Sequence, residues 1–77
     1  MLPLSMAQAG DQLMVVRIGG NDEAKKHLED LGFVVGTPVQ VVSAPGNGNV
    51  IVALKGARLA ITSQMAAKIQ VTEGEKQ

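Results

Sequence analysis

The sequence predicts a mainly β domain, a small five-stranded SH3-like barrel with one helix after the first strand and short helical turns. Two observations favour this class. Apolar residues make up 45% of the 77-residue chain, and they are mostly valine, leucine, isoleucine and alanine, which suit the packed faces of short strands. Glycine, proline and asparagine recur between the apolar runs and provide the turns that short strands need.

We expect one domain over residues 1–77, with 73–77 as a frayed, charged tail. A chain this short buries only about 60% of its unfolded surface, so it needs a compact and regularly patterned core. Long open strand edges favour aggregation, and five short strands are therefore expected to curl into a barrel. The expected strands are Gln12–Ile18, Thr37–Ser43, Val50–Leu54, Ala57–Ile61 and Ile69–Thr72.

Short helical turns and tight hairpins connect these strands. One helical turn is expected within Leu2–Ala9, with Ser5 as its N-cap, and another over Gln64–Lys68, capped by Thr62 or Ser63. The tight turns are indicated by dipeptides that tolerate a positive φ, and these are Asn47-Gly48 within the Pro45–Gly48 loop and Lys55-Gly56.

The clearest helix is expected over Asn21–Leu31. Asn21 is a suitable N-cap, because its side chain accepts a hydrogen bond from an early helical N–H. Ala24, Leu28 and Leu31 recur at i, i+4 and i+7, so they form one apolar stripe.

This helix is expected to end in a Schellman motif. Gly32 would take the left-handed conformation at C′, which places Phe33 at C″, where it packs on Leu28. The residues that we expect to have structural roles are therefore Leu28, Leu31, Gly32, Phe33, Asn47 and Gly48.

Charge and composition exclude several classes of function. Seven Lys and Arg balance seven Asp and Glu, and Trp and Tyr are absent, so the basic surface and the stacking platforms of a nucleic-acid binder are missing. The chain has no Cys, and no Ser has an evident His and acid partner. Gly46-Asn47-Gly48 lacks the Gly-Lys-Ser/Thr ending of a phosphate loop. We therefore expect no enzyme, no cofactor and no catalytic residues.

The location predicted from the sequence is the cytoplasm. No apolar run approaches the ~20 residues that span a bilayer, so direct membrane insertion is not expected. The N-terminus has no basic region followed by an apolar stretch, so it does not resemble a signal peptide.

One cluster on the predicted helix has the side chains of a weak metal site. His27 is the only histidine, Glu23 lies four residues before it, and Asp30 lies three after it. A selective site for a first-row metal needs several preorganised ligands with an organised second shell, which solvated carboxylates and one histidine do not provide. We therefore predict no functional metal site and keep Glu23, His27 and Asp30 as minor candidates.

Two predicted strands are apolar on both faces, although a small barrel has only one interior. We assign the interior by strand alternation, although the pattern alone also allows the opposite choice of faces. The interior set is Val16, Ile18, Val50 and Val52. The outward set, which is the candidate partner-binding surface, is Leu13, Val15, Ile51 and Ala53. Uncovered apolar patches mark partner sites, but the sequence equally allows the Asn21–Leu31 helix to cover this one.

The ordered set of these features resembles the ferrous iron transport protein A family, and also the related C-terminal SH3-like domain of iron-dependent repressors. The resemblance extends over almost the whole chain. The matching segments are Leu4-Ser5 with Gly10, the Val16–Gly20 region, Leu28–Phe33, Gly36, Val39–Val42, the Pro45–Gly48 hairpin, Leu59–Ile61 and Ala66–Val71.

The resemblance implies a cytoplasmic accessory protein that docks on the cytosolic part of a large ferrous-iron membrane transporter with a GTP-binding domain. Recruitment to the inner face of the membrane would then come from this protein partner. The resemblance does not imply iron binding by the chain. If the chain stimulates hydrolysis of GTP by its partner, Arg17 and Arg58 are its cationic candidates, although nothing singles out either.

Two alternatives remain. One is a regulatory SH3-like module related to iron-dependent repressors, although 77 residues filled by a barrel leave no room for a helix-turn-helix. The other is a direct but weak metal binder, acting as an iron sensor or carrier.

Overall fold

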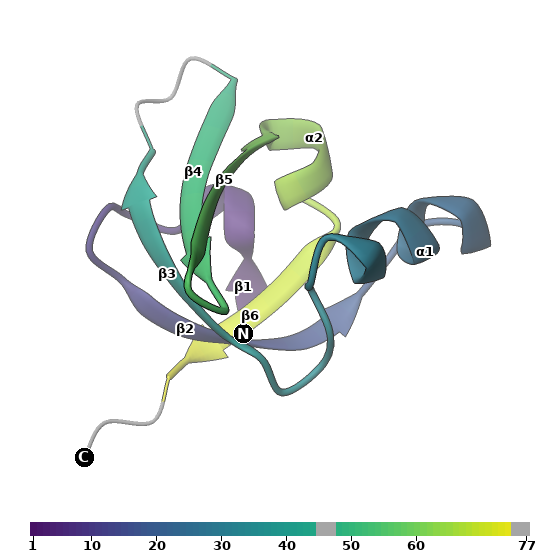
Figure 1. Ribbon diagram of the computed structural model, residues 1–77, viewed down its shortest axis with the longest axis horizontal. Helices are drawn as coiled ribbons and strands as arrows, with labels where there is room; N and C mark the ends of the chain where they lie inside the picture. Colours follow the sequence, from purple (N-terminus) through teal and green to yellow (C-terminus); the bar gives the residue numbers. More distant parts are fainter. Residues whose placement is uncertain (45–47, 75–77) are drawn as a thin grey trace.

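The computed structural model describes residues 1–44 and 48–74. Its strands are β1 (Leu2–Pro3), β2 (Gln12–Ile18), β3 (Pro38–Ser43), β4 (Asn49–Leu54), β5 (Ala57–Thr62) and β6 (Ile69–Glu73). The helices are a 3₁₀ turn, η1 (Leu4–Met6), and two α-helices, α1 (Asp22–Asp30) and α2 (Ser63–Ala66). Within the described residues the strands form one antiparallel sheet in the order β1-β6-β2-β3-β4-β5, which curls strongly (Figure 1).

The expected mainly β class is confirmed, but the closed five-stranded barrel is wrong. The sheet in the described part of the chain has six strands, and its two edges, β1 and β5, do not pair with each other. The space between the edges is bridged by helical turns, because η1 contacts β6 and α2, while α2 contacts β4 and β5. The unexpected strand β1 comes from Leu2 and Pro3, which pair with Val71 and Gln70 of β6.

The bulge in β2 decides which side chains enter the core. Val15 pairs with Val71 and Arg17 pairs with Gln70, so Val16 is an extra residue on β2. The alternation of faces shifts at this point, since two residues of one strand oppose one of its partner. As a result Leu13, Val15 and Ile18 are all buried, whereas Val16 is half-buried.

The assignment of faces from simple alternation was therefore wrong for half of β2. Leu13 and Val15 belong to the core and do not face outward, because the sequence pattern does not reveal the bulge. The assignment is confirmed for Ile18 in β2 and for Val50 and Val52 in β4, which are buried. In β4 the side chains of Ile51 and Ala53 are half-buried on the opposite face, as expected.

Helix α1 begins and ends as the sequence predicts. The Asn21 side chain accepts a hydrogen bond of 2.8 Å from the Ala24 N–H. At the other end Gly32 has φ +111°, and its N–H donates to the Glu29 carbonyl while the Phe33 N–H donates to the Leu28 carbonyl. These two bonds are those of a Schellman motif, and Leu28 and Phe33 are both buried.

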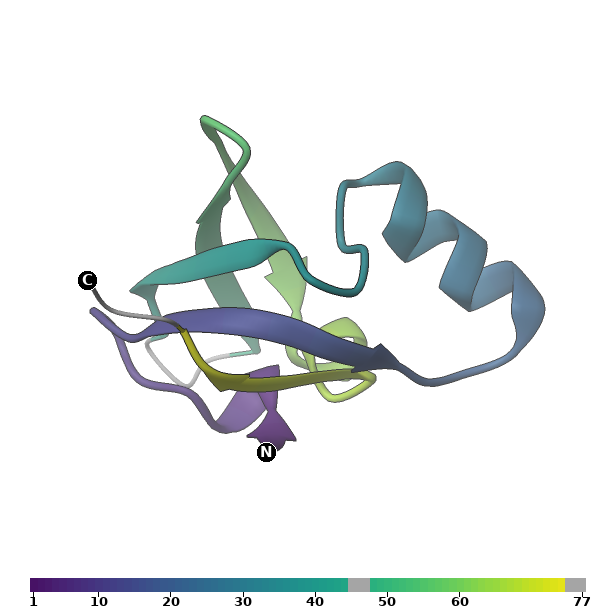
Figure 2. The same cartoon turned by 90° about the horizontal axis from the view of Figure 1, so that it is seen from below.

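The apolar stripe of α1 is narrower than predicted. Leu31 is 38% exposed and Ala24 is half-buried, so Leu28 is the residue through which α1 enters the core. Figure 2 shows α1 standing beyond one end of the sheet and not lying over a face of it. The helix therefore does not cover the outward face of β4.

Several local expectations are also corrected. Ser5 lies inside η1 and is not a cap, since Pro3 precedes the turn without a side-chain bond. Of the two candidate caps for α2, Thr62 accepts a 3.1 Å bond from the Met65 N–H. Glu73 is the last residue of β6, and the Gly74 N–H donates to the Gln12 carbonyl, so the predicted tail does not begin at 73. Residues 75–77 lie outside the described part.

The hairpin between β3 and β4 is confirmed by their antiparallel pairing. Gly48 has φ +107°, the positive value expected there, whereas Asn47 lies outside the described residues. The Lys55-Gly56 turn is also confirmed, since these two residues have φ +53° and +79°. Two consecutive positive φ values are typical of the type I′ turn that closes two-residue hairpins.

We predict that Val15→Asp abolishes cooperative unfolding and leaves the chain without a fixed tertiary structure. Val15 is fully buried, and an unpaired buried charge costs about 3–5 kcal/mol, a large share of the about 5–15 kcal/mol that stabilises a typical domain. Val35→Asp is the matched control, since Val35 is 66% exposed. Circular dichroism and thermal melting measure the fold and the stability of both variants. A Val15→Asp chain that melts like the control would contradict our placement of the core.

Candidate docking groove

A groove opens where β2, the start of β3 and the β4–β5 turn meet. It encloses about 580 Å³, which is within the range of about 300–1,000 Å³ typical of ligand pockets. We call it the docking groove, and its lining comes from four short segments, Gln12–Met14, Gly36–Gln40, Ala53–Gly56 and Gly74.

Strand pairing places the lining side chains. Leu13 pairs with Val39, and both side chains belong to the buried core, whereas Met14 and Pro38 pair on the opposite, outer face of the sheet. Leu54 is a core residue too, and Ala53 beside it lies on the outer face. Met14 and Pro38 are at least partly exposed, so a partner can reach them without unfolding the sheet.

The segment after α1 is fixed to the groove by its backbone. The Val15 N–H donates to the Thr37 carbonyl at 3.0 Å, and the Gly36 N–H donates to the Val15 carbonyl at 2.8 Å. Thr37 is itself buried, and its N–H donates to the Val34 carbonyl. These bonds extend the β2–β3 ladder past Pro38, so the wall formed by residues 36–38 is well anchored.

Lys55 is the one charged residue among the described residues that line the groove. It is exposed and lies in the β4–β5 turn with a positive φ, as does Gly56. The groove therefore combines the apolar side chains of Met14, Pro38 and Ala53 with a single cation, Lys55, among its described lining residues. An apolar segment with a carboxylate beside Lys55 would match this arrangement.

Two of the four predicted docking residues line the groove. Ala53 contributes from the outer face of β4, as predicted, whereas the Leu13 side chain belongs to the core and does not lie on the outer face where the sequence pattern placed it. Val15 is fully buried and is not available to a partner. Ile51 is half-buried on the outward face of β4, outside the groove lining.

Sequence reasoning missed Met14, Pro38 and Lys55. Met14 was treated as one more apolar position of a two-faced strand, and nothing in the local pattern shows that it borders a cavity. Pro38 carried a usable signal, because a proline at the start of a strand indicates a position where the ladder is interrupted.

A second cavity, of about 650 Å³, lies beside the N-terminus and shares Gln12 and Leu13 with the groove. Its lining includes two carboxylates, Asp11 and Glu73. One oxygen of Asp11 already accepts a 2.9 Å hydrogen bond from the Gln8 N–H, so this carboxylate has a structural role. The apolar groove is the better candidate for docking.

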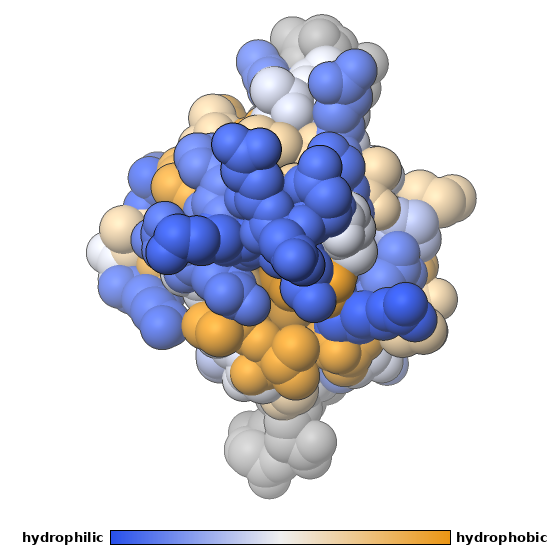
Figure 3. Space-filling view, turned by 90° about the vertical axis from the view of Figure 1, so that its right-hand side faces the viewer, coloured by the Kyte–Doolittle hydropathy of each residue, from blue (hydrophilic) through white to orange (hydrophobic). Residues whose placement is uncertain are grey.

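The candidate metal ligands Glu23, His27 and Asp30 lie on α1 and are all exposed. Among the described residues no group of three or more His, Cys, Asp or Glu side chains is arranged to hold a metal ion. The structure therefore does not bring these three side chains together as a site. Figure 3 shows this face of the molecule, with hydrophilic side chains over α1 and an apolar patch beside them.

Apolar side chains are also exposed in the segment that follows α1. Leu31 and Val34 are 38% and 40% exposed, and Val35 is 66% exposed. These three residues come from one short segment, whereas the docking groove gathers apolar side chains from three strands, those of Met14, Pro38 and Ala53. We therefore treat the groove as the primary candidate.

Comparison with known proteins now assigns the family. Residues 2–73 match the FeoA domain family, which is nearly the whole chain. The chain belongs to the FeoA family. A protein of Methanocaldococcus jannaschii named "Putative Fe(2+) transport protein A" is 33% identical over 75 residues, which cover 97% of this chain and 90% of the relative. The expected resemblance is thereby confirmed.

Solved structures agree with this FeoA assignment. A crystal structure of an iron uptake regulatory protein (FeoA) has a TM-score of 0.86 and 32% identity, covering 94% of this chain and 95% of that chain. A manganese-dependent transcriptional repressor has a TM-score of 0.84 at 22% identity, covering 92% of this chain but 40% of the repressor. At that identity the repressor shares the fold, and the likeness says nothing of function.

FeoA proteins are transport accessory proteins and not enzymes, which confirms the expected class of function. No helix in the described part of this FeoA domain is long and apolar enough to cross a membrane.

We predict that His27→Ala changes neither the melting temperature nor the metal binding of this FeoA domain. His27 is exposed on α1 and belongs to no cluster of ligands among the described residues. Titration calorimetry with ferrous iron under anaerobic conditions should show at most weak binding to both forms. A tight one-to-one complex that the variant loses would show that α1 carries a true site.

Proposed function

We propose that this FeoA domain is a cytoplasmic accessory protein that docks on the cytosolic part of a ferrous-iron membrane transporter and modulates iron uptake. The observation that carries the proposal is the docking groove, an uncovered apolar cleft on a chain of the FeoA family. The name of the Methanocaldococcus jannaschii relative, which refers to Fe(2+) transport, supports the choice of process. The partner region is the part of the transporter that carries its GTP-binding domain.

The groove fits a segment of a partner better than a broad flat surface. The apolar side chains that a partner can reach form its rim and belong to Met14, Pro38 and Ala53, which come from three neighbouring strands. Central apolar anchors carry most interface energy, whereas rim charges mainly affect the rate of encounter. We therefore attribute most of the binding free energy to these apolar side chains and the orientation of the partner to Lys55.

Docking modulates transport if the partner exists in two conformations and the FeoA domain prefers one of them. A ligand shifts such an equilibrium only by the difference between its affinities for the two states. A preference of about 1.4 kcal/mol multiplies the ratio of the two states by about ten when the domain is bound. This mechanism requires no chemistry from the FeoA domain.

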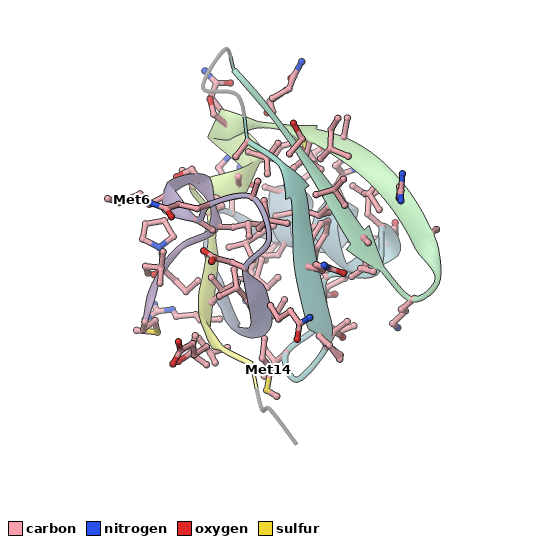
Figure 4. All side chains as sticks on the ribbon, turned by 90° about the vertical axis from the view of Figure 1, so that its left-hand side faces the viewer. Met6 and Met14 are labelled. Carbon is pink, nitrogen blue, oxygen red and sulfur yellow. The ribbon has the colours of Figure 1, made fainter. Side chains whose placement is uncertain are left out.

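We predict that Met14→Glu weakens docking without unfolding the domain, because it places a carboxylate on the apolar rim of the groove. Met6→Glu is the matched control. Met6 is 70% exposed and lies outside the groove lining, and Figure 4 shows the two methionines on different parts of the molecule. The measurement is co-purification of the tagged domain with the co-expressed transporter, together with ferrous-iron uptake by the same cells.

Met14→Glu should reduce both co-purification and the effect on uptake at least about tenfold, the result of losing about 1.4 kcal/mol of binding free energy. Met6→Glu should resemble the wild type in both assays. Melting curves of the two variants serve as the folding check. A folded Met14→Glu domain that still co-purifies with the transporter would move the docking surface elsewhere.

A further inference from the structure

The two edges of the sheet are built differently. Edge strand β1 is two residues long and contains Pro3, which has no N–H to offer a further strand. Edge strand β5 is six residues long, contains no proline, and pairs with β4 without a register shift from Thr62 to Ala57. Proteins usually blunt an edge with proline, bulges, very short length or charged side chains, and of these β5 carries only a charge, the exposed Arg58.

The register of the β4–β5 hairpin identifies the backbone groups that face outward. The two-residue turn at Lys55-Gly56 makes Leu54 and Ala57 the closing hydrogen-bonded pair. Because bonded and non-bonded pairs alternate along an antiparallel ladder, the N–H and C=O groups of Arg58 and Ala60 point away from β4. No other backbone hydrogen bond to Arg58 or Ala60 occurs among the described residues.

The side chains at this edge leave the outward groups accessible. Arg58 and Ala60 are exposed, while Leu59 is half-buried and Ile61 is buried, so the strand is anchored through its inward side chains. Residues 55–62 include two cations, Lys55 and Arg58, and no acidic residue. The open ladder is therefore flanked by positive charge.

We propose that the free edge of β5 accepts an extended, acidic segment of a protein partner as an additional strand of the sheet. Strand addition of this kind takes its affinity from main-chain hydrogen bonds and its selectivity from alternate side chains. Here the outward groups of Arg58 and Ala60 provide the bonds, and Arg58 and Lys55 select carboxylates. This inference rests on the proposed docking function, since Lys55 and Gly56 also line the groove, and it adds a second contact with its own chemistry.

The test uses the full chain labelled with ¹⁵N and a synthetic peptide of alternating valine and glutamate, about as long as β5. Addition of the peptide should shift the amide signals of β5 and slow hydrogen exchange at Arg58 and Ala60. A peptide of the same length with lysine in place of glutamate should bind at least about tenfold more weakly. Shifts confined to other strands, or equal binding of the two peptides, would overturn the proposal.

Ala60→Pro removes the outward N–H without breaking a bond to β4, as proline is tolerated on edge strands whose N–H faces solvent. It should weaken peptide binding by about tenfold, the upper end of the loss of one hydrogen bond. Ala60→Ser keeps the N–H and should bind like the wild type. If Ala60→Pro melts at a lower temperature than the wild type, the test is hydrogen exchange at Arg58 and Ala60 of the wild-type domain. The absence of any slowing of this exchange by the peptide overturns the proposal.

These outcomes are separate from those of the docking function. An edge that binds the acidic peptide supports strand addition whether or not the wild-type domain co-purifies with the transporter. The converse result is a domain that co-purifies with the transporter through its groove while the peptide leaves hydrogen exchange at Arg58 and Ala60 unchanged. That result contradicts strand addition and leaves the docking function standing.

Discussion

The structure depends on how the backbone of β2 is held at Val15. This residue pairs with Val71 of β6 on one side, and on the other it exchanges hydrogen bonds with Gly36 and Thr37. The adjacent bulge at Val16 turns Val15 and Ile18 to the same side, so β2 contributes to the single core on both sides of the bulge. The β6 strand, β2 and the segment after α1 meet at this point.

The candidate site follows from that junction. Because Val15 holds Gly36 and Thr37, the chain reaches β3 along a fixed path, and Pro38 comes to lie opposite Met14. The Lys55-Gly56 turn of the β4–β5 hairpin forms the facing wall. Helix α1 stands beyond the end of the sheet and is attached through Leu28 and its Schellman ending, so the groove remains uncovered. The groove and the open β5 edge meet at this turn.

Local signals in the sequence were reliable where a few adjacent residues determine the backbone. The cap at Asn21, the positive φ at Gly32 and the Lys55-Gly56 turn were all predicted, because each depends on side-chain chemistry within one turn. The inward and outward faces of β2 were not predicted correctly, because a bulge is set by pairing with a distant strand. For the same reason the sequence indicated Leu13 and Ala53 but not the groove between them, which exists only when three strands come together.

The measurement that tests the account most directly is a titration of the ¹⁵N-labelled FeoA domain with the purified cytosolic domain of the transporter. We predict that amide signals of residues 13–14, 36–37, 39–40 and 53–56 shift or broaden as the partner is added, while those of α1 stay in place. Changes confined to α1, or a spectrum unaltered by excess partner, would contradict docking through the groove.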